Sequence, residues 1–248
     1  MGFLEAIRFL TVLPLPMGQA PSERAVARSI VYFPLVGALL GAVLALIDWG
    51  LRHLWSPQLT AAVVLVAWMG LTGGLHLDGL ADTADGLLGG WNREQRLAIM
   101  RDSRLGTFGA LALFAALLLK FSLIGQLSLT WRGRSLVLAP ILARWVMVQA
   151  ITCYPPARGE GLGHFFRQHV GAMDLILASV VALALSLLCC GLWGLAILAG
   201  VLLVALLFNS GVTRSIGGLT GDTYGALCEV EEIWVLATLA ALEGGGLL

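Results

Sequence analysis

Charged side chains are scarce in this sequence. Of its 248 residues, 12% are Asp, Glu, Lys or Arg and 58% are hydrophobic, and the mean hydropathy is +0.89. This composition excludes an ordinary soluble protein and predicts the lipid bilayer as the surrounding medium. The 15 basic residues balance the 15 acidic ones, so net charge gives no reason to expect a nucleic-acid partner.

Cysteine is also scarce, and its spacing excludes the usual cysteine-based sites. The chain has four cysteines with no CxxC pair and no Cys/His metal-binding spacing: Cys153, Cys189, Cys190 and Cys228. We expect them to be packing residues. A cleaved signal peptide is not expected either, because Glu5 and Arg8 interrupt the apolar residues near the start of the chain.

Long apolar runs dominate the sequence. A bilayer core about 30 Å thick needs about 20 apolar residues in a helix, and a helix satisfies its own backbone groups in lipid. Seven stretches approach that length: 28–50, 58–75, 107–129, 135–153, 172–191, 193–213 and 230–247. They predict an all-α, polytopic integral membrane protein with about seven transmembrane helices. Without an internal repeat or a soluble domain, residues 1–248 should form one membrane-embedded catalytic domain.

An interfacial helix is expected at the start of the chain. Within residues 3–13, Glu5 and Arg8 lie away from one helical face, and the helix should stop at Pro14 and Pro16. The residues of that face are Phe3, Ile7, Leu10 and Thr11. Placing this end in the cytoplasm puts most arginines inside and leaves only Arg52, Arg132 and Arg134 outside. The long loops 76–106, 154–171 and 214–229 then face the cytoplasm, together with nearly all of the acidic residues.

The run Gly73–Gly86 is the most informative segment, because three acids stand among small apolar residues. On a helix, Asp78, Asp82 and Asp85 would share one face, where like charges repel. A bound cation would relieve that repulsion, and Mg²⁺ is commonly held by one or two carboxylates together with substrate phosphates and water. His76 can act as a general base, orient a carboxylate or bind phosphate. The competing interpretation is a solvated helix end, which would normally carry more polar neighbours.

A second run, Arg93–Gly109, combines arginines with one acid. Its apolar spacing predicts an amphipathic surface helix that ends near Gly106. Arg101 and Arg104 can meet phosphate or nucleotide charge, and Asp102 can bind metal or fix an arginine. The alternative is an anchor that holds the following membrane helix by its positive charge.

A third run, Gly217–Ala226, again places one acid among glycines and hydroxyls. Its flexible backbone could cradle phosphate around Asp222 and Thr223. Residues 161–166 are a weaker candidate for a substrate loop. Arg144 and Lys120 lie inside apolar stretches, where an ionisable side chain either serves function or pairs with an acid for structural reasons.

Taken together, these runs resemble the adenosylcobinamide-GDP ribazoletransferase family, also called cobalamin synthase. Five blocks carry the resemblance and span most of the chain: Phe9–Pro16, Tyr32–Gly37, Gly74–Gly86, Ile99–Gly109 and Leu219–Ala226. The order of the blocks is far more specific than any one of them. No motif acid departs from the pattern.

The resemblance implies a Mg²⁺-dependent inner-membrane phosphotransferase with its active site facing the cytoplasm. It would join adenosylcobinamide-GDP to α-ribazole or α-ribazole 5′-phosphate and release GMP. Assembly into a homo-oligomer is left open. The implied catalytic residues are His76, Asp78, Asp82, Asp85 and Asp102, of which Asp78, Asp82 and Asp85 would bind metal. The implied substrate-binding residues are Arg101, Arg104, Gly106, Thr107, Asp222 and Thr223.

Two other functions fit parts of the sequence. A CDP-alcohol phosphotransferase also uses a spaced Asp/Gly motif and Mg²⁺ at a membrane face, but its usual arrangement begins with Asp-x-x-Asp-Gly and includes an Ala-Arg pair that this run lacks. A transporter would place acids inside the apolar spans, whereas most acids here lie at one face.

Overall fold

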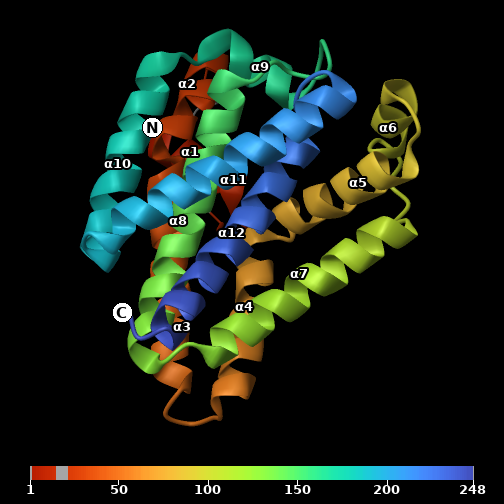
Figure 1. Ribbon diagram of the computed structural model, residues 1–248. Helices are drawn as coiled ribbons and strands as arrows, with labels where there is room; N and C mark the ends of the chain where they lie inside the picture. The colour runs from red at the N-terminus through yellow and green to blue at the C-terminus, as the bar shows by residue number, and fades with distance from the viewer. Residues whose placement is uncertain (1, 15–21, 248) are drawn as a thin grey trace.

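The computed structural model describes residues 2–14 and 22–247, and within them the chain is helical with no β-strand (Figure 1). The helices are α1 Gly2–Leu10, α2 Glu23–Arg28, the 3-10 turn η1 Ser29–Tyr32, α3 Phe33–Leu51, α4 Pro57–Thr72, α5 Leu75–Gly89, α6 Arg93–Ile99, α7 Thr107–Gln126, α8 Leu129–Cys153, α9 Leu162–His169, α10 Ala172–Cys190, α11 Trp193–Ile216 and α12 Gly221–Gly244. The expected all-α membrane fold is therefore confirmed.

Five helical segments are long and apolar enough to cross a membrane. They are Glu23–Leu51, α7, α8, α10 and α11, and a sixth span exists only if α4 and α5 are counted together across an 88° bend. Seven spans are thus not confirmed. The expected stretch 58–75 is the short helix α4, and α5 turns sharply out of its direction.

The expected last span, 230–247, belongs to the longer helix α12. This helix begins at Gly221, and it is not among the candidate spans. Its acids Glu231 and Glu232 are fully buried inside the protein. In Figure 1, α12 crosses the bundle diagonally and contacts α5, α7, α8 and α11. The helix is therefore an internal element that carries charge into the bundle.

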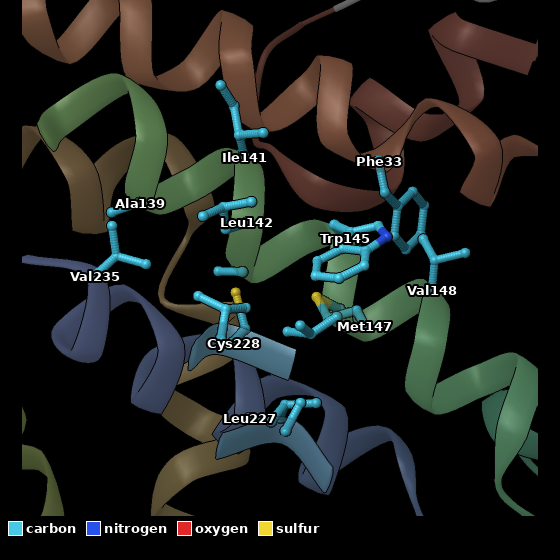
Figure 2. Close-up of a cluster of buried hydrophobic side chains, with 14 of the residues drawn as sticks. Phe33, Ala139, Ile141, Leu142, Trp145, Met147, Val148, Leu227, Cys228 and Val235 are labelled. Carbon is cyan, nitrogen blue, oxygen red and sulfur yellow. The ribbon is translucent and has the colours of Figure 1, made fainter. Parts of the chain in front are cut away.

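The core lies around α8, the most deeply buried candidate span. Figure 2 shows its side chains between α3 on one side and α12 on the other, with Leu142 near Cys228 of α12 and Trp145 beside Phe33 of α3. Glycines let α3 approach α8 closely. A Cβ on Gly37 would come within 2.4 Å of the Pro140 carbonyl oxygen, so that position admits no side chain.

The N-terminal helix is shorter than the sequence indicates. α1 ends at Leu10, and its buried face consists of Ala6, Ile7 and Leu10. Its position at a membrane interface stays a prediction. Pro16, which was expected to help stop this helix, lies outside the described residues together with Leu15 of the first motif block.

Candidate active site

A double-glycine bend separates α4 from α5 and positions the acidic run. Gly73 and Gly74 both adopt left-handed backbone conformations, with φ of 62° and 70°, and so end one helix and begin the next. Residues with a Cβ rarely adopt such angles, and glycine adopts them without penalty. The bend leaves Asp78 in the first turn of α5, where the helix dipole favours a negative charge.

Close packing then brings α5 against the N-terminus of α12. A Cβ on Gly79 would lie 2.6 Å from the Asp222 carbonyl oxygen, and a Cβ on Gly225 would lie 3.2 Å from the His76 Cα atom. Only glycine allows the two backbones to approach so closely. The first and third sequence runs, which are far apart in the chain, therefore meet at one place.

The carboxylates at this meeting point interact electrostatically. Asp78 is exposed, whereas Asp82 and Asp222 are half-buried. Burial, followed by the charges of Asp78, Asp222 and Asp85, raises the pKa of Asp82 from its ordinary value of 3.8 to about 6. Burial also raises the pKa of Asp222, although the nearby Arg158 guanidinium opposes the effect. Like charges are thus concentrated where a cation or a positively charged group would be stabilising.

Three adjoining hollows surround these acids. A large groove of about 750 Å³ is lined by Asp78 and Asp82 together with apolar side chains of α4, α5 and α7. An inner cavity of about 110 Å³ shares Asp78 with the groove and also contains Asp222. An outer hollow of about 150 Å³ shares Asp222 with the inner cavity and contains Arg158. Asp78 and Asp222 therefore mark the two junctions between the hollows.

Asp85 has a different environment from the other acids of α5. It is buried, and its carboxylate accepts hydrogen bonds from the backbone N–H groups of Gly106, at 2.7 Å, and Gly109, at 2.8 Å. These N–H groups belong to the start of α7. Asp85 therefore caps α7 in this structure, and its metal-binding role stays a prediction.

The charged residues of the arginine run do not join the meeting point of α5 and α12, although Ser103 and Leu105 of this run line the large groove. Asp102 and Arg104 pair with each other, with Nε donating to Oδ1 over 2.9 Å. The hydrogen bond from the Arg104 side chain lowers the pKa of Asp102 to about 2. With Gly106 and Thr107 they line a separate open hollow beside Asp85. Their substrate and catalytic roles stay predictions.

The rest of this run also differs from expectation. The surface helix α6 ends at Ile99 rather than near Gly106, because Gly106 is already the N-cap of α7. Arg101 pairs with Glu160 over 2.7 Å across to the loop before α9. Arg93 donates to the carbonyl oxygens of Ile216 and Ala157, at 2.9 and 2.7 Å. These arginines tie the surface loops together.

Thr223 takes part in the N-terminal cap of α12. Its hydroxyl accepts a hydrogen bond from the Thr220 N–H over 2.8 Å and donates to the Thr220 carbonyl oxygen over 2.9 Å. The Thr220 hydroxyl in turn donates to Asp222 over 3.2 Å. This capping arrangement holds Asp222 at the helix N-terminus, and substrate binding by Thr223 stays a prediction.

The ionisable residues inside the apolar stretches are paired with acids of α12. Lys120 of α7 contacts Glu229 over 2.6 Å and also contacts Glu232, which pairs in turn with Arg144 of α8. Arg144 also approaches His76 Nδ1, at 3.4 Å. This buried ionic cluster lies behind the site and joins α5, α7, α8 and α12.

Sequence reasoning missed Arg158 as a site residue. It lies in the loop between α8 and α9, beside Asp222, and donates to the Leu97 carbonyl oxygen over 2.9 Å, while its Nε has no partner among the described residues. Its only sequence signal was its place in an expected cytoplasmic loop. Residues 161–166, expected as a substrate loop, form the N-cap and first turns of α9 and line the outer hollow through Gly161 and His164.

The acids fit a metal held jointly with a ligand better than a metal held by protein alone. In the part of the chain that the structure describes, no three His, Cys, Asp or Glu side chains are grouped closely enough to hold a metal ion. Mg²⁺ commonly takes only one or two carboxylates and completes its coordination with water and substrate phosphates. Asp78, Asp82 and Asp222 offer carboxylates of that kind.

Fold and site together define a polytopic α-helical membrane protein with a carboxylate-rich site where α5 meets α12. Comparison with known families makes the assignment specific. The profile of the family described as cobalamin-5-phosphate synthase matches residues 2–240, and this chain belongs to that family.

Relatives support the same assignment. The chain is 49% identical over 235 residues to an adenosylcobinamide-GDP ribazoletransferase of Roseiflexus sp. (strain RS-1). The aligned residues cover 95% of this chain and 87% of that protein. It is 45% identical over 239 residues to the protein of that name from Herpetosiphon aurantiacus, covering 96% and 95%. A Pseudomonas putida relative of the same name is 41% identical, covering 97% and 98%. No solved structure matches the chain.

Proposed function

We propose that this chain joins adenosylcobinamide-GDP to α-ribazole or α-ribazole 5′-phosphate, releases GMP and so completes the nucleotide loop of cobalamin. The family assignment and the shared name of its relatives support this activity. The structural observation that carries it is the convergence of Asp78, Asp82 and Asp222 on adjoining hollows. Carboxylates of this kind can hold a cation that also binds the phosphates of a diphosphate substrate.

The two junction acids suit a displacement at phosphorus. A ribazole hydroxyl attacks the phosphorus attached to cobinamide, a new P–O ester bond forms, and the phosphoanhydride bond breaks as GMP leaves. The hydroxyl proton passes to a carboxylate at the junction of the two hollows. Asp78 is the candidate, because it lines both the large groove and the inner cavity.

Mg²⁺ is the proposed cofactor, held by Asp78 and Asp82 on α5 and by Asp222 on α12. When bound, it supplies neutralising charge to the phosphate oxygens. On the other side of Asp222, Arg158 lines the outer hollow with its Nε unpartnered among the described residues, which supports a role in binding the phosphate of the leaving GMP. The groove, which has the largest of these volumes, is assigned to the cobinamide part of the first substrate.

The cytoplasmic side of the bacterial inner membrane is the proposed location of this site. The support is the excess of arginine in the loops on the same side as α6 and α9. The open groove also borders Leu113 and Leu117 of the candidate span α7, so a large amphipathic substrate could reach it along the membrane boundary.

Purified protein in detergent tests the proposal directly. GMP should appear when adenosylcobinamide-GDP, α-ribazole and Mg²⁺ are all present, and should not appear when α-ribazole is omitted. Failure to release GMP from the complete mixture would contradict the activity. Undiminished GMP release in EDTA would contradict the proposed Mg²⁺ requirement and leave the proposed activity standing.

A further inference from the structure

The inner cavity differs in character from the hollows on either side of it. Most of its wall is apolar or aromatic and comes from the N-terminal helix, α8, α9 and α12: Phe9, Met147, Ile151, Leu162, Phe166 and Tyr224. Phe9 and Phe166 meet edge to face, with ring centroids 5.6 Å apart. Of the described residues that line it, only Asp78 and Asp222 bear a carboxylate, and both stand at its junctions.

One buried polar group of this cavity lacks a partner. His76 is 2% exposed and lines the cavity, and its Nδ1 lies 3.4 Å from an Arg144 nitrogen. A guanidinium can only donate, so Nδ1 is the acceptor and the ring proton sits on Nε2. Nε2 has no hydrogen-bond partner among the described residues. A buried donor without an acceptor is uncommon in folded proteins, and an acceptor atom of a ligand or of a water would satisfy it.

We propose that the inner cavity binds the aromatic base of the nucleoside acceptor, with His76 Nε2–H donating to the unsubstituted ring nitrogen of that base. This inference rests on the proposed function, in which the acceptor is a ribazole, and the base of ribazole is a benzimidazole. The sugar then lies at the cavity mouth. Its hydroxyl reaches the junction marked by Asp78, beside the groove that holds the phosphorus.

Size and polarity favour this base over the other ring systems of the reaction. A cavity of about 110 Å³ is smaller than the roughly 300–1,000 Å³ typical of whole drug-sized ligands, so it admits one ring system and not a corrin. Guanine carries several donors and acceptors, and most would be left unpaired against this wall. A benzimidazole has an apolar face and one acceptor nitrogen, which match the apolar wall and the single orphan donor.

A pair of nucleosides isolates the proposed hydrogen bond. α-Ribazole and its 5,6-dimethylindole counterpart have similar shapes, but the second has a C–H in place of the acceptor nitrogen. The wild-type protein should have a KM for α-ribazole about ten- to hundredfold below that for the indole riboside, as expected for one buried hydrogen bond. His76→Leu should abolish this preference by raising the KM for α-ribazole alone, with the KM for adenosylcobinamide-GDP little changed.

The outcomes separate the inference from the function on which it rests. No GMP release from either nucleoside by the wild type would defeat the proposed function. GMP release with equal KM values for the two nucleosides would leave that function standing and overturn the inference. Equal effects of His76→Leu on both nucleosides would overturn it as well. His53→Leu, on the exposed turn between α3 and α4, is the matched histidine control and should keep the preference.

A second variant guards against a folding defect in the first, because His76 touches the buried ionic cluster. Met147→Phe enlarges a side chain of the cavity wall and leaves His76 in place, so it should raise the KM for both nucleosides. Met69→Phe makes the same change in the groove and should act on adenosylcobinamide-GDP instead. If Met147→Phe left both nucleoside KM values unchanged, the cavity would not hold the base.

Discussion

At the scale of single residues, the site is a set of carboxylates whose charges oppose one another. Burial and three neighbouring acids raise the pKa of Asp82 to about 6. The folded state therefore holds this proton more tightly than the unfolded chain does. Ionisation of Asp82 therefore costs the folded state more free energy than it costs the unfolded chain. This destabilisation is largest above pH 6, where the folded form must carry the charge, and it disappears as the pH falls below the ordinary pKa of 3.8.

Asp82→Asn should separate stability from activity. In EDTA at pH 8 the variant should melt at a higher temperature than the wild type, because it removes one of the mutually repelling charges, and the difference should vanish near pH 4. Mg²⁺ should stabilise the wild type more than the variant, and GMP release should be almost lost. A variant that keeps wild-type GMP release across a Mg²⁺ titration would contradict an essential role for Asp82.

The sequence singled out the acids that the structure brings together, but it could not show the local environment of each. Asp78, Asp82 and Asp222 stand out as acids among glycines, and glycine is what lets their helices meet. Asp85 looks equivalent to them in the sequence. In the structure its carboxylate caps α7, because the N-terminus of that helix lies beside it, and its metal-binding role stays a prediction. Spacing along one helix cannot show which other helix begins next to it.

At the scale of elements, Asp85 links α5 to the start of α7. It satisfies two backbone N–H groups that would otherwise have no helical partner. The cap also closes the turn that carries Asp102 and Arg104. The position of the arginine run therefore depends on a carboxylate of the acidic run, which lines the same hollow as Asp102 and Arg104.

Asp85→Ala should loosen this connection. Loss of the buried acceptor should cost about 1–3 kcal/mol of unfolding free energy, since one buried and one partly buried N–H group are left unpaired. Hydrogen exchange should quicken at residues 106–109 more than at the far end of α7. Asp102→Ala, which removes an acid from the same hollow but no helix cap, is the control. Equal exchange rates at 106–109 in wild type and Asp85→Ala would contradict the capping role.

The elements that sequence reasoning misjudged share one cause. Periodicity and hydropathy indicated most of the helices, including α3, α7, α8, α10 and α11. They failed for α12, because Glu229 and Glu232 pair inside the bundle with Lys120 and Arg144 rather than standing at a membrane surface. Glu231 is buried there as well. They also failed at residues 58–75, where two glycines turn the chain by 88° instead of letting one span continue.

At the scale of the whole molecule, the site needs both of its acidic runs on one side of the membrane. Their contact across Gly79 and Gly225 places them together in the fold, and the arginine bias predicts the cytoplasmic side. The turn between α3 and α4, which contains Ser56, should face the periplasm.

Cysteine labelling in intact cells checks this topology. In a Cys153→Ser background, which removes the exposed native thiol, Glu94→Cys and Arg214→Cys should resist a membrane-impermeant maleimide. Ser56→Cys should react. All three replaced side chains belong to exposed residues, so accessibility within the fold is matched. Labelling of residues 94 and 214 from outside would reverse the orientation.

The central claim is that α5 and α12 form one site that clamps a single diphosphate. The measurement that tests it most directly is kcat/KM for GMP release by Asp78→Asn, Asp222→Asn and the double variant at saturating Mg²⁺. Each single change should cost about 10²-fold, the scale of one electrostatic contact to a transition state. Residues of one catalytic unit are not additive, so the double variant should lose little more than either single one. A double loss equal to the product of the two single losses would mean two independent sites.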